Sequence, residues 1–156
     1  MLQQANGYTS TDRMRYLLVD GHSVIFAWPE LQRLHARRMV SARELLIRQL
    51  TDYQDATGVH VVAVFDGQGE KFNEDTAPGG IQIFYSASGQ SADEIIERLV
   101  AKYGKEHEIT VVTNDLMEQQ TVTTFGAVAV SVDSLRQMLE ASAGEVGRRL
   151  KELRKK

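Results

Sequence analysis

Acidic residues stand at the ends of three mostly apolar segments of this sequence. The segments and the acids that follow them are residues 16–19 with Asp20, residues 59–65 with Asp66, and residues 109–113 with Asp115. Nearly continuous apolar runs of this length are typical of strands buried on both faces, as in a parallel sheet covered by helices. Because α/β proteins bind ligands at the carboxyl edge of such a sheet, these acids are predicted to meet at one functional edge.

A fourth acid, Asp93, stands at the start of a predicted helix over residues 92–103. The segment Ser91-Ala-Asp-Glu94 has the spacing of a capping box, which opens helices. Asp93 and Glu97 are four residues apart and lie at the border of the apolar helix face, whereas Glu94 points toward solvent. Asp93 is therefore predicted to reach the same sheet edge as the strand-end acids.

Converging carboxylates favour a bound cation. At an effective dielectric near 20, carboxylates within about 5 Å of one another repel by a few kcal/mol, so they must take up protons or bind a cation. The candidate ligands are hard oxygens and the chain has no cysteine, which favours Mg²⁺ or Mn²⁺ over zinc. Such an ion can activate water and neutralise charge on a phosphate oxygen, as phosphodiester hydrolysis requires.

Predicted strands and helices alternate along the chain. Two further strands are expected at residues 81–85 and 127–132. Alternation with right-handed crossovers predicts a three-layer α/β/α fold, with a parallel sheet of about five strands in the order 3-2-1-4-5. The first and fourth strands are then neighbours, so Asp20 and Asp115 are expected side by side, with Asp66 one strand away.

The connecting segments complete this prediction. One helix is expected to begin at Pro29, a second at the capping box Ser41-Ala-Arg-Glu44, and the last with Asp133 as its cap and interruptions at Gly144 and Gly147. Residues 68–80 are predicted to form a long loop, and residues 115–124 a polar segment without assigned structure.

Composition limits the classes of function. A length of 156 residues fits one domain, which we divide into a flexible tail at 1–13, the domain at 14–143 and a basic helical tail at 144–156. No apolar run approaches the ~20 residues of a membrane span, and no targeting segment is evident, so a cytoplasmic protein is expected. The net charge of −3 gives no global attraction to nucleic acid, so RNA contact would need a local basic patch such as Arg148 and Arg149.

Four motifs in order resemble the YacP-like branch of the NYN domain, which is related to PIN-domain nucleases. They are Leu-Leu-Val-Asp-Gly-His-Ser-Val-Ile-Phe-Ala-Trp-Pro-Glu-Leu at 17–31, Val-Phe-Asp-Gly at 64–67, Ser-Ala-Asp-Glu-Ile-Ile-Glu-Arg-Leu at 91–99 and Val-Thr-Asn-Asp at 112–115. The resemblance covers about residues 16–139. It implies a PIN-like fold and a Mg²⁺- or Mn²⁺-dependent endoribonuclease of the cytoplasm that cleaves single-stranded RNA. Messenger RNA in connection with translation, and therefore the ribosome, are the partners it suggests.

The resemblance also implies roles for single residues. The expected metal ligands are Asp20, Asp93, Asp115 and Glu97, and the expected catalytic acids are Asp20, Asp66, Asp93 and Asp115. We expect the substrate to contact His22, Ser23, Asn114, Arg148 and Arg149. The family's first motif usually reads Asp-Gly-Tyr-Asn, whereas here His22 and Ser23 follow the glycine, so the orientation of Asp20 is in question and His22 is a candidate phosphate contact.

Other classes of protein fit less well. A receiver domain would need a lysine after a late strand, and an Asp-x-Asp phosphatase would need an acid where His22 stands. The sequence has no Walker-type loop and no Gly-x-Gly-x-x-Gly motif, which argues against a nucleotide cofactor. The remaining alternative is a PIN-like module that binds RNA or a partner protein and cleaves weakly.

Overall fold

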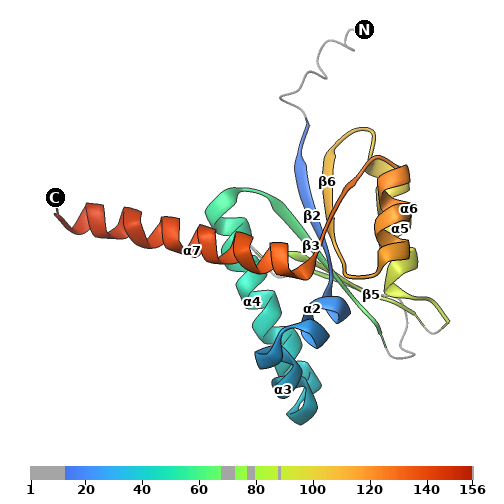
Figure 1. The fold of residues 1–156 in the computed structure, drawn as a ribbon, viewed down its shortest axis with the longest axis horizontal. Helices are drawn as coiled ribbons and strands as arrows, with labels where there is room; N and C mark the ends of the chain where they lie inside the picture. Colours follow the sequence, from blue (N-terminus) through green and yellow to red (C-terminus); the bar gives the residue numbers. More distant parts are fainter. Residues whose placement is uncertain (1–12, 68–72, 77–79, 88, 156) are drawn as a thin grey trace, which may run out of the picture.

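The protein folds into three layers, a twisted sheet with helices on both faces (Figure 1). The structure is a computed structural model that describes residues 13–67, 73–76, 80–87 and 89–155. The strands are β2 (Arg15–Asp20), β3 (His60–Phe65), β4 (Asn73–Thr76), β5 (Gln82–Tyr85), β6 (Glu108–Val112) and β7 (Val128–Val130). The helices are α2 (Gly21–Ala27), α3 (Pro29–Arg37), α4 (Met39–Thr57), α5 (Ala92–Tyr103), α6 (Leu116–Thr124) and α7 (Val132–Lys155).

The strand order is β4-β5-β3-β2-β6-β7. Without β4 this is the predicted 3-2-1-4-5 order, and all of its pairings are parallel, so the predicted fold is confirmed. Strand β4 pairs antiparallel with β5 at the edge of the sheet. The prediction of an unstructured loop over 68–80 is therefore wrong where β4 forms, and residues 68–72 and 77–79 lie outside the described residues.

Side chains alternate between the two faces of the central strands and form two cores. Leu17 and Val19 of β2 pack against α2, α3, α4 and α7, whereas Leu18 packs against α5 and α6. Because both faces of these strands are buried, their sequences are apolar nearly without interruption. The side chain of Asp20 follows Leu18 in this alternation, which directs it toward the α5 and α6 side.

Two predicted helix starts are wrong. Helix α4 begins at Met39 with Arg38 as its N-cap, before the capping-box sequence at Ser41, and no side chain caps it. The earlier start lets the N–H of buried Ala42 donate to the Arg38 carbonyl (3.3 Å), which satisfies a buried donor. Helix α7 begins at Val132, where Ser131 Oγ accepts from Ser134 N (3.2 Å), so Asp133 lies in the first turn rather than at the cap.

Two other segments are more helical than predicted. Residues 116–124 form α6, which the sequence left unassigned, and α7 continues through Gly144 and Gly147. A glycine inside a helix costs only about 1 kcal/mol, and ion pairs from Glu145 to Arg148 and Arg149 bridge the turn that contains Gly147. Within the described residues, no helix combines the length and apolar character needed to cross a bilayer.

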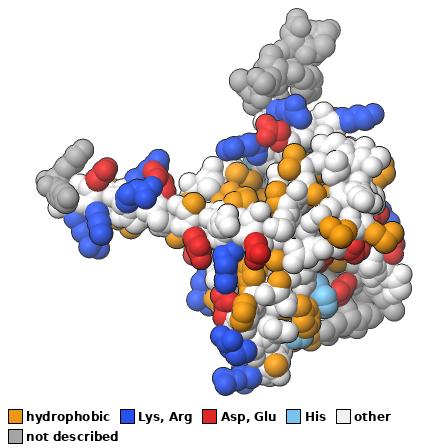
Figure 2. Space-filling model, in the orientation of Figure 1, with side chains coloured by type: hydrophobic (Ala, Val, Ile, Leu, Met, Phe, Trp, Pro, Cys, Tyr) orange, Lys and Arg blue, Asp and Glu red, His pale blue; other side chains and the backbone are white. Residues whose placement is uncertain are grey.

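The C-terminal half of α7 extends away from the sheet and helices (Figure 1). Figure 2 shows basic side chains spread along this projecting end, with acidic ones among them. Exposed members of this basic segment include Arg148, Arg149, Lys151 and Arg154. The basic charge predicted for the C-terminal tail is therefore presented on a helix that stands clear of the domain.

Candidate metal centre

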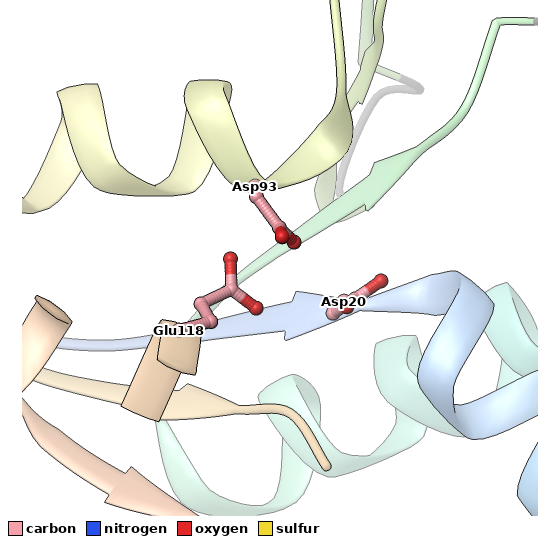
Figure 3. Close-up of side chains that lie close together, drawn as sticks. All are labelled: Asp20, Asp93 and Glu118. Carbon is pink, nitrogen blue, oxygen red and sulfur yellow. The ribbon is translucent and has the colours of Figure 1, made fainter. Parts of the chain in front are cut away.

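Three acids converge at the carboxyl edge of the sheet. Asp20 ends β2, Asp93 lies in the first turn of α5 and Glu118 lies in the first turn of α6. One carboxylate oxygen from each lies within 4.8 Å of the other two. Figure 3 shows the three side chains pointing toward one another from these three elements. Two of the acids stand at helix N-termini, where the helix dipole favours negative charge.

Asp20 is held in place by the turn that follows it. The chain passes directly from β2 into α2 through Gly21, where a Cβ atom would lie 2.3 Å from Cε1 of Phe65, so only glycine fits. Asp20 is the N-cap of α2: its Oδ1 accepts from Ser23 N (3.4 Å) and its Oδ2 from Ser23 Oγ (2.9 Å). Buried Thr113 also donates its hydroxyl to Oδ2 (3.4 Å). Ser23 therefore orients Asp20 although it is shorter than the asparagine of the family motif.

Asp93 owes its position to the start of α5. The predicted capping box is confirmed, because Ser91 Oγ accepts from Glu94 N (3.2 Å) and the Glu94 carboxylate accepts from Ser91 N (3.4 Å). Asp66, at the end of β3, accepts from Ala92 N (3.3 Å). This bond ties the first turn of α5 to the sheet edge and sets the place from which Asp93 reaches the cluster.

Glu118 is the site residue that the sequence analysis missed. It belongs to the segment predicted as polar and unassigned, and only it and Val122, four residues on, are buried in α6. Glu118 is 2% exposed, and its carboxylate oxygens make no hydrogen bond of standard geometry among the described residues, although Asp93 and Thr113 lie beside them. Asp115 followed three residues later by Glu118 is a helix-start signature that could have located α6.

The electrostatics of the cluster disfavour full ionisation. Burial raises the pKa of Glu118 to about 8, with the neighbouring Asp93 carboxyl group adding to the effect. Burial also raises the pKa of Asp20, and the charge of Asp93 acts in the same direction, while the Ser23 hydrogen bonds oppose it. Without a cation, the cluster therefore retains protons to a higher pH than isolated carboxyl groups do.

A hollow of about 410 Å³ opens beside the cluster. Its lining includes most of the residues predicted for the site, namely Asp20, His22, Ser23, Asp66, Asp93 and Asp115. Asp115 is the N-cap of α6, where its Oδ1 accepts from Met117 N (2.9 Å) and Glu118 N (3.3 Å). His22 Nδ1 lies 3.5 Å from Asp66 Oδ2 in the wall of the hollow. Asp20, Asp66 and Asp115 thus line one hollow, but among the described residues the acids close enough to share a cation include Glu118 and neither Asp115 nor Glu97.

The remaining predicted residues lie outside the lining of this hollow. Glu97 is half-buried one turn along α5, and burial followed by the charge of Asp93 raises its pKa. Asn114 accepts from Val132 N (3.1 Å) through Oδ1, which links the end of β6 to the start of α7. Arg148 and Arg149 pair with Glu145 on the projecting part of α7.

The donor set fits a hard divalent cation. Three carboxylates supply oxygen ligands within a short span, and no described residue offers a thiolate because the chain has no cysteine. Buried carboxylate oxygens without a partner are costly, so the bare Glu118 group needs either a proton or a cation. The cluster could therefore bind a metal ion of the Mg²⁺ or Mn²⁺ type.

Comparisons with known proteins agree with this geometry. Residues 17–156 match the family described as the YacP-like NYN domain. The chain is 32% identical over 142 residues to the uncharacterized protein YacP of Bacillus subtilis (strain 168), a match that covers 90% of this chain and 84% of that protein.

Two crystal structures of Rae1 (YacP) from Bacillus subtilis are also similar. One has a TM-score of 0.76 at 33% identity and covers 90% of this chain and 82% of that chain. The other, of a mutant, has a TM-score of 0.77 at 30% identity, with coverage of 90% and 84%. On these matches, the chain belongs to the YacP-like NYN domain family, within the PIN-like nuclease superfamily.

Proposed function

We propose that this protein is a metal-dependent endoribonuclease that hydrolyses phosphodiester bonds of single-stranded RNA. One observation supports the proposal above the others: a fully buried carboxyl group, Glu118, faces Asp20 and Asp93 and makes no hydrogen bond of standard geometry among the described residues. Burial of this group is unfavourable in its ionised form, so it needs either a proton or a cation, and a bound cation would stabilise the ionised form. Membership of a nuclease superfamily supports the same activity.

The acids have separate proposed roles. Asp20, Asp93 and Glu118 would hold Mg²⁺ or Mn²⁺, with Ser23 and Thr113 fixing the Asp20 carboxylate. A bound ion of this kind would supply an activated water and neutralise charge on a phosphate oxygen. Asp66 and Asp115 stand on the wall of the adjoining hollow as candidate catalytic acids, and each also accepts a backbone N–H at a helix start. Glu97 is a candidate for an outer position near the ion.

The proposed substrate and setting are those that the resemblance to the family suggests. RNA, specifically messenger RNA presented during translation, is the proposed substrate, which makes the ribosome a proposed partner and the cytoplasm the proposed location. His22 and Ser23 line the hollow and are the nearest candidates for substrate contact. Asn114, Arg148 and Arg149 would contact RNA farther from the acids.

Incubation of the purified protein with a circular single-stranded RNA tests the proposal, because a substrate without ends is opened only by an endonuclease. We expect linear product in Mn²⁺ or Mg²⁺ and none in EDTA. Asp133→Asn, an exposed acid in α7, should cleave like the unmodified protein and serves as the matched control. Binding of the circle without opening it in any metal would instead support the alternative, a catalytically weak binding module.

A further inference from the structure

We propose that His22, Phe26 and His35, here called the aromatic trio, form a nucleobase-binding site beside the acidic hollow. The inference rests on the proposed function and extends it from the reacting phosphate to a neighbouring base. The sequence indicated His22 as a substrate or phosphate contact and gave no function to Phe26 or His35.

The three rings contact one another in a row. The ring centroids of His22 and Phe26 are 4.5 Å apart, and those of Phe26 and His35 are 4.8 Å apart. His22 and Phe26 are one turn apart on α2, and His35 comes from α3, so two helices fix the row. In Figure 2, histidine side chains lie beside hydrophobic ones on the visible face, with acidic side chains close by.

Phe26 remains accessible in the middle of this row. Its side chain is 42% exposed although it contacts a ring on each side. Phe26 and His22 line the acidic hollow, and both also line a second hollow of about 100 Å³ that includes His35. A base stacked on Phe26 would therefore lie beside Asp20 and Asp93, which line the same hollow.

Arg43 brings positive charge to the second hollow. Its guanidinium lies over the rings of Phe65 and Tyr85, at 5.6 and 5.5 Å, and its Nη2 donates to the carbonyl of Asp66 (3.2 Å). These contacts hold the cation in the wall that the aromatic trio shares with Asp66. When one phosphate of an RNA chain approaches the acidic cluster, the Arg43 guanidinium would therefore lie close to the neighbouring nucleotide.

These features together fit an unpaired nucleotide. Bases of single-stranded RNA stack on aromatic and histidine rings, and each stack is worth about 1–3 kcal/mol by alanine substitution, with little dependence on the base. A paired base is already stacked within its duplex and is not free to occupy such a site. The aromatic trio would accordingly favour single-stranded RNA without strong sequence preference.

Binding of an RNA that contains 2-aminopurine at alternate positions tests the inference, with every protein carrying Asp93→Asn to prevent cleavage. Adding Phe26→Leu should raise the RNA dissociation constant about 5- to 150-fold and weaken the quenching of 2-aminopurine, because a stacking surface is removed. Phe26→Trp should retain both properties. Phe125→Leu is the matched control, since Phe125 is 44% exposed at the end of α6 and should leave binding unchanged.

The outcomes separate this inference from the proposed function. If the protein with native Asp93 cleaves RNA in Mn²⁺ but Phe26→Leu changes neither affinity nor quenching, the nucleobase site is refuted and the nuclease remains. If the native protein neither binds nor cleaves RNA, both proposals fail. Loss of affinity in both Phe26→Leu and Phe26→Trp, with an unchanged melting temperature, would also contradict a stacking role.

Discussion

Glu118 is buried, whereas most glutamates lie at the protein surface. Its carboxyl group lies beside two other acids and makes no hydrogen bond of standard geometry among the described residues, and burial raises its pKa to about 8. At neutral pH without metal the group therefore retains its proton. A divalent cation must displace that proton, so metal affinity should increase with pH.

This raised pKa predicts the pH dependence of stability. The folded protein holds the Glu118 proton more tightly than the unfolded chain does, so the metal-free protein should lose stability as pH rises from 4.5, the ordinary value, to about 8. Burial raises the pKa of Asp20 and acts in the same direction. Glu118→Gln removes the titrating group and should flatten the dependence.

Thermal unfolding in EDTA at about pH 5, 6.5 and 8 measures this effect. The native protein should show a melting temperature that falls with pH more steeply than that of Glu118→Gln. Asp133→Asn should retain the native slope. Parallel curves for the native protein and Glu118→Gln would show that Glu118 does not titrate with a raised pKa.

Ser23 is predicted to position Asp20 rather than to react. Its hydroxyl donates to Asp20 Oδ2 at 2.9 Å, so Ser23→Ala removes the shortest hydrogen bond that orients this carboxylate. Loss of a group that orients a metal ligand typically costs 10- to 100-fold, and we expect a fall of roughly that size in kcat/KM. Ser23→Asn introduces the usual family residue and should retain activity. Metal titration of Ser23→Ala gives the check, because an unchanged metal affinity would contradict a positioning role.

The sequence predicted Asp20 and Asp93 because each stands at a recognisable boundary, a strand end or a capping box. Glu118 and Thr113 were missed for physical reasons. Glu118 is buried because it lies on the inner face of α6. The Thr113 hydroxyl reaches Asp20 only because β6 lies beside β2 in the sheet. Contacts between segments far apart in the chain have no local sequence signature.

At the scale of elements, the strands were easier to predict than α6. Apolar runs of β2 and β3 stand out because both faces are buried, whereas α6 exposes Leu116 and Met117 and buries an acid. Threonines 121, 123 and 124 also lower its helix propensity, although each hydroxyl donates to the carbonyl four residues earlier. The inner face of α6 therefore serves both the site, through Glu118, and the core, through Val122.

Helix α7 gives the electrostatic prediction at this scale. Arg148→Gln with Arg149→Gln should raise the RNA dissociation constant and reduce its salt dependence, by about 0.7 in the log–log slope for each RNA phosphate that the helix no longer neutralises. The control is Arg48→Gln with Arg98→Gln, exposed arginines on α4 and α5. Titrations between about 50 and 200 mM salt measure both slopes. Equal slopes for the native protein and the α7 variant would exclude this helix from RNA binding.

At the scale of the molecule, the strand order explains why the acids meet. Strand β2 lies between β3 and β6, and helices α5 and α6 begin on the same side of the sheet, so Asp20, Asp93 and Glu118 come together from segments far apart in the chain. This order follows from the alternation of strands and helices and was predictable from the sequence. The antiparallel strand β4 was not, because its residues 73–76 are polar and carry no apolar periodicity.

The measurement that tests the central claim most directly is the rate of cleavage of end-labelled single-stranded RNA in Mn²⁺ and in EDTA. We predict cleavage by the native protein in Mn²⁺ alone. Asp93→Asn and Glu118→Gln should each lose at least about 100-fold, equivalent to about 2.7 kcal/mol of transition-state stabilisation, while remaining folded. Asp133→Asn should cleave normally. Full, metal-dependent activity in both Asp93→Asn and Glu118→Gln would contradict the assignment of the three-acid cluster as the catalytic metal centre.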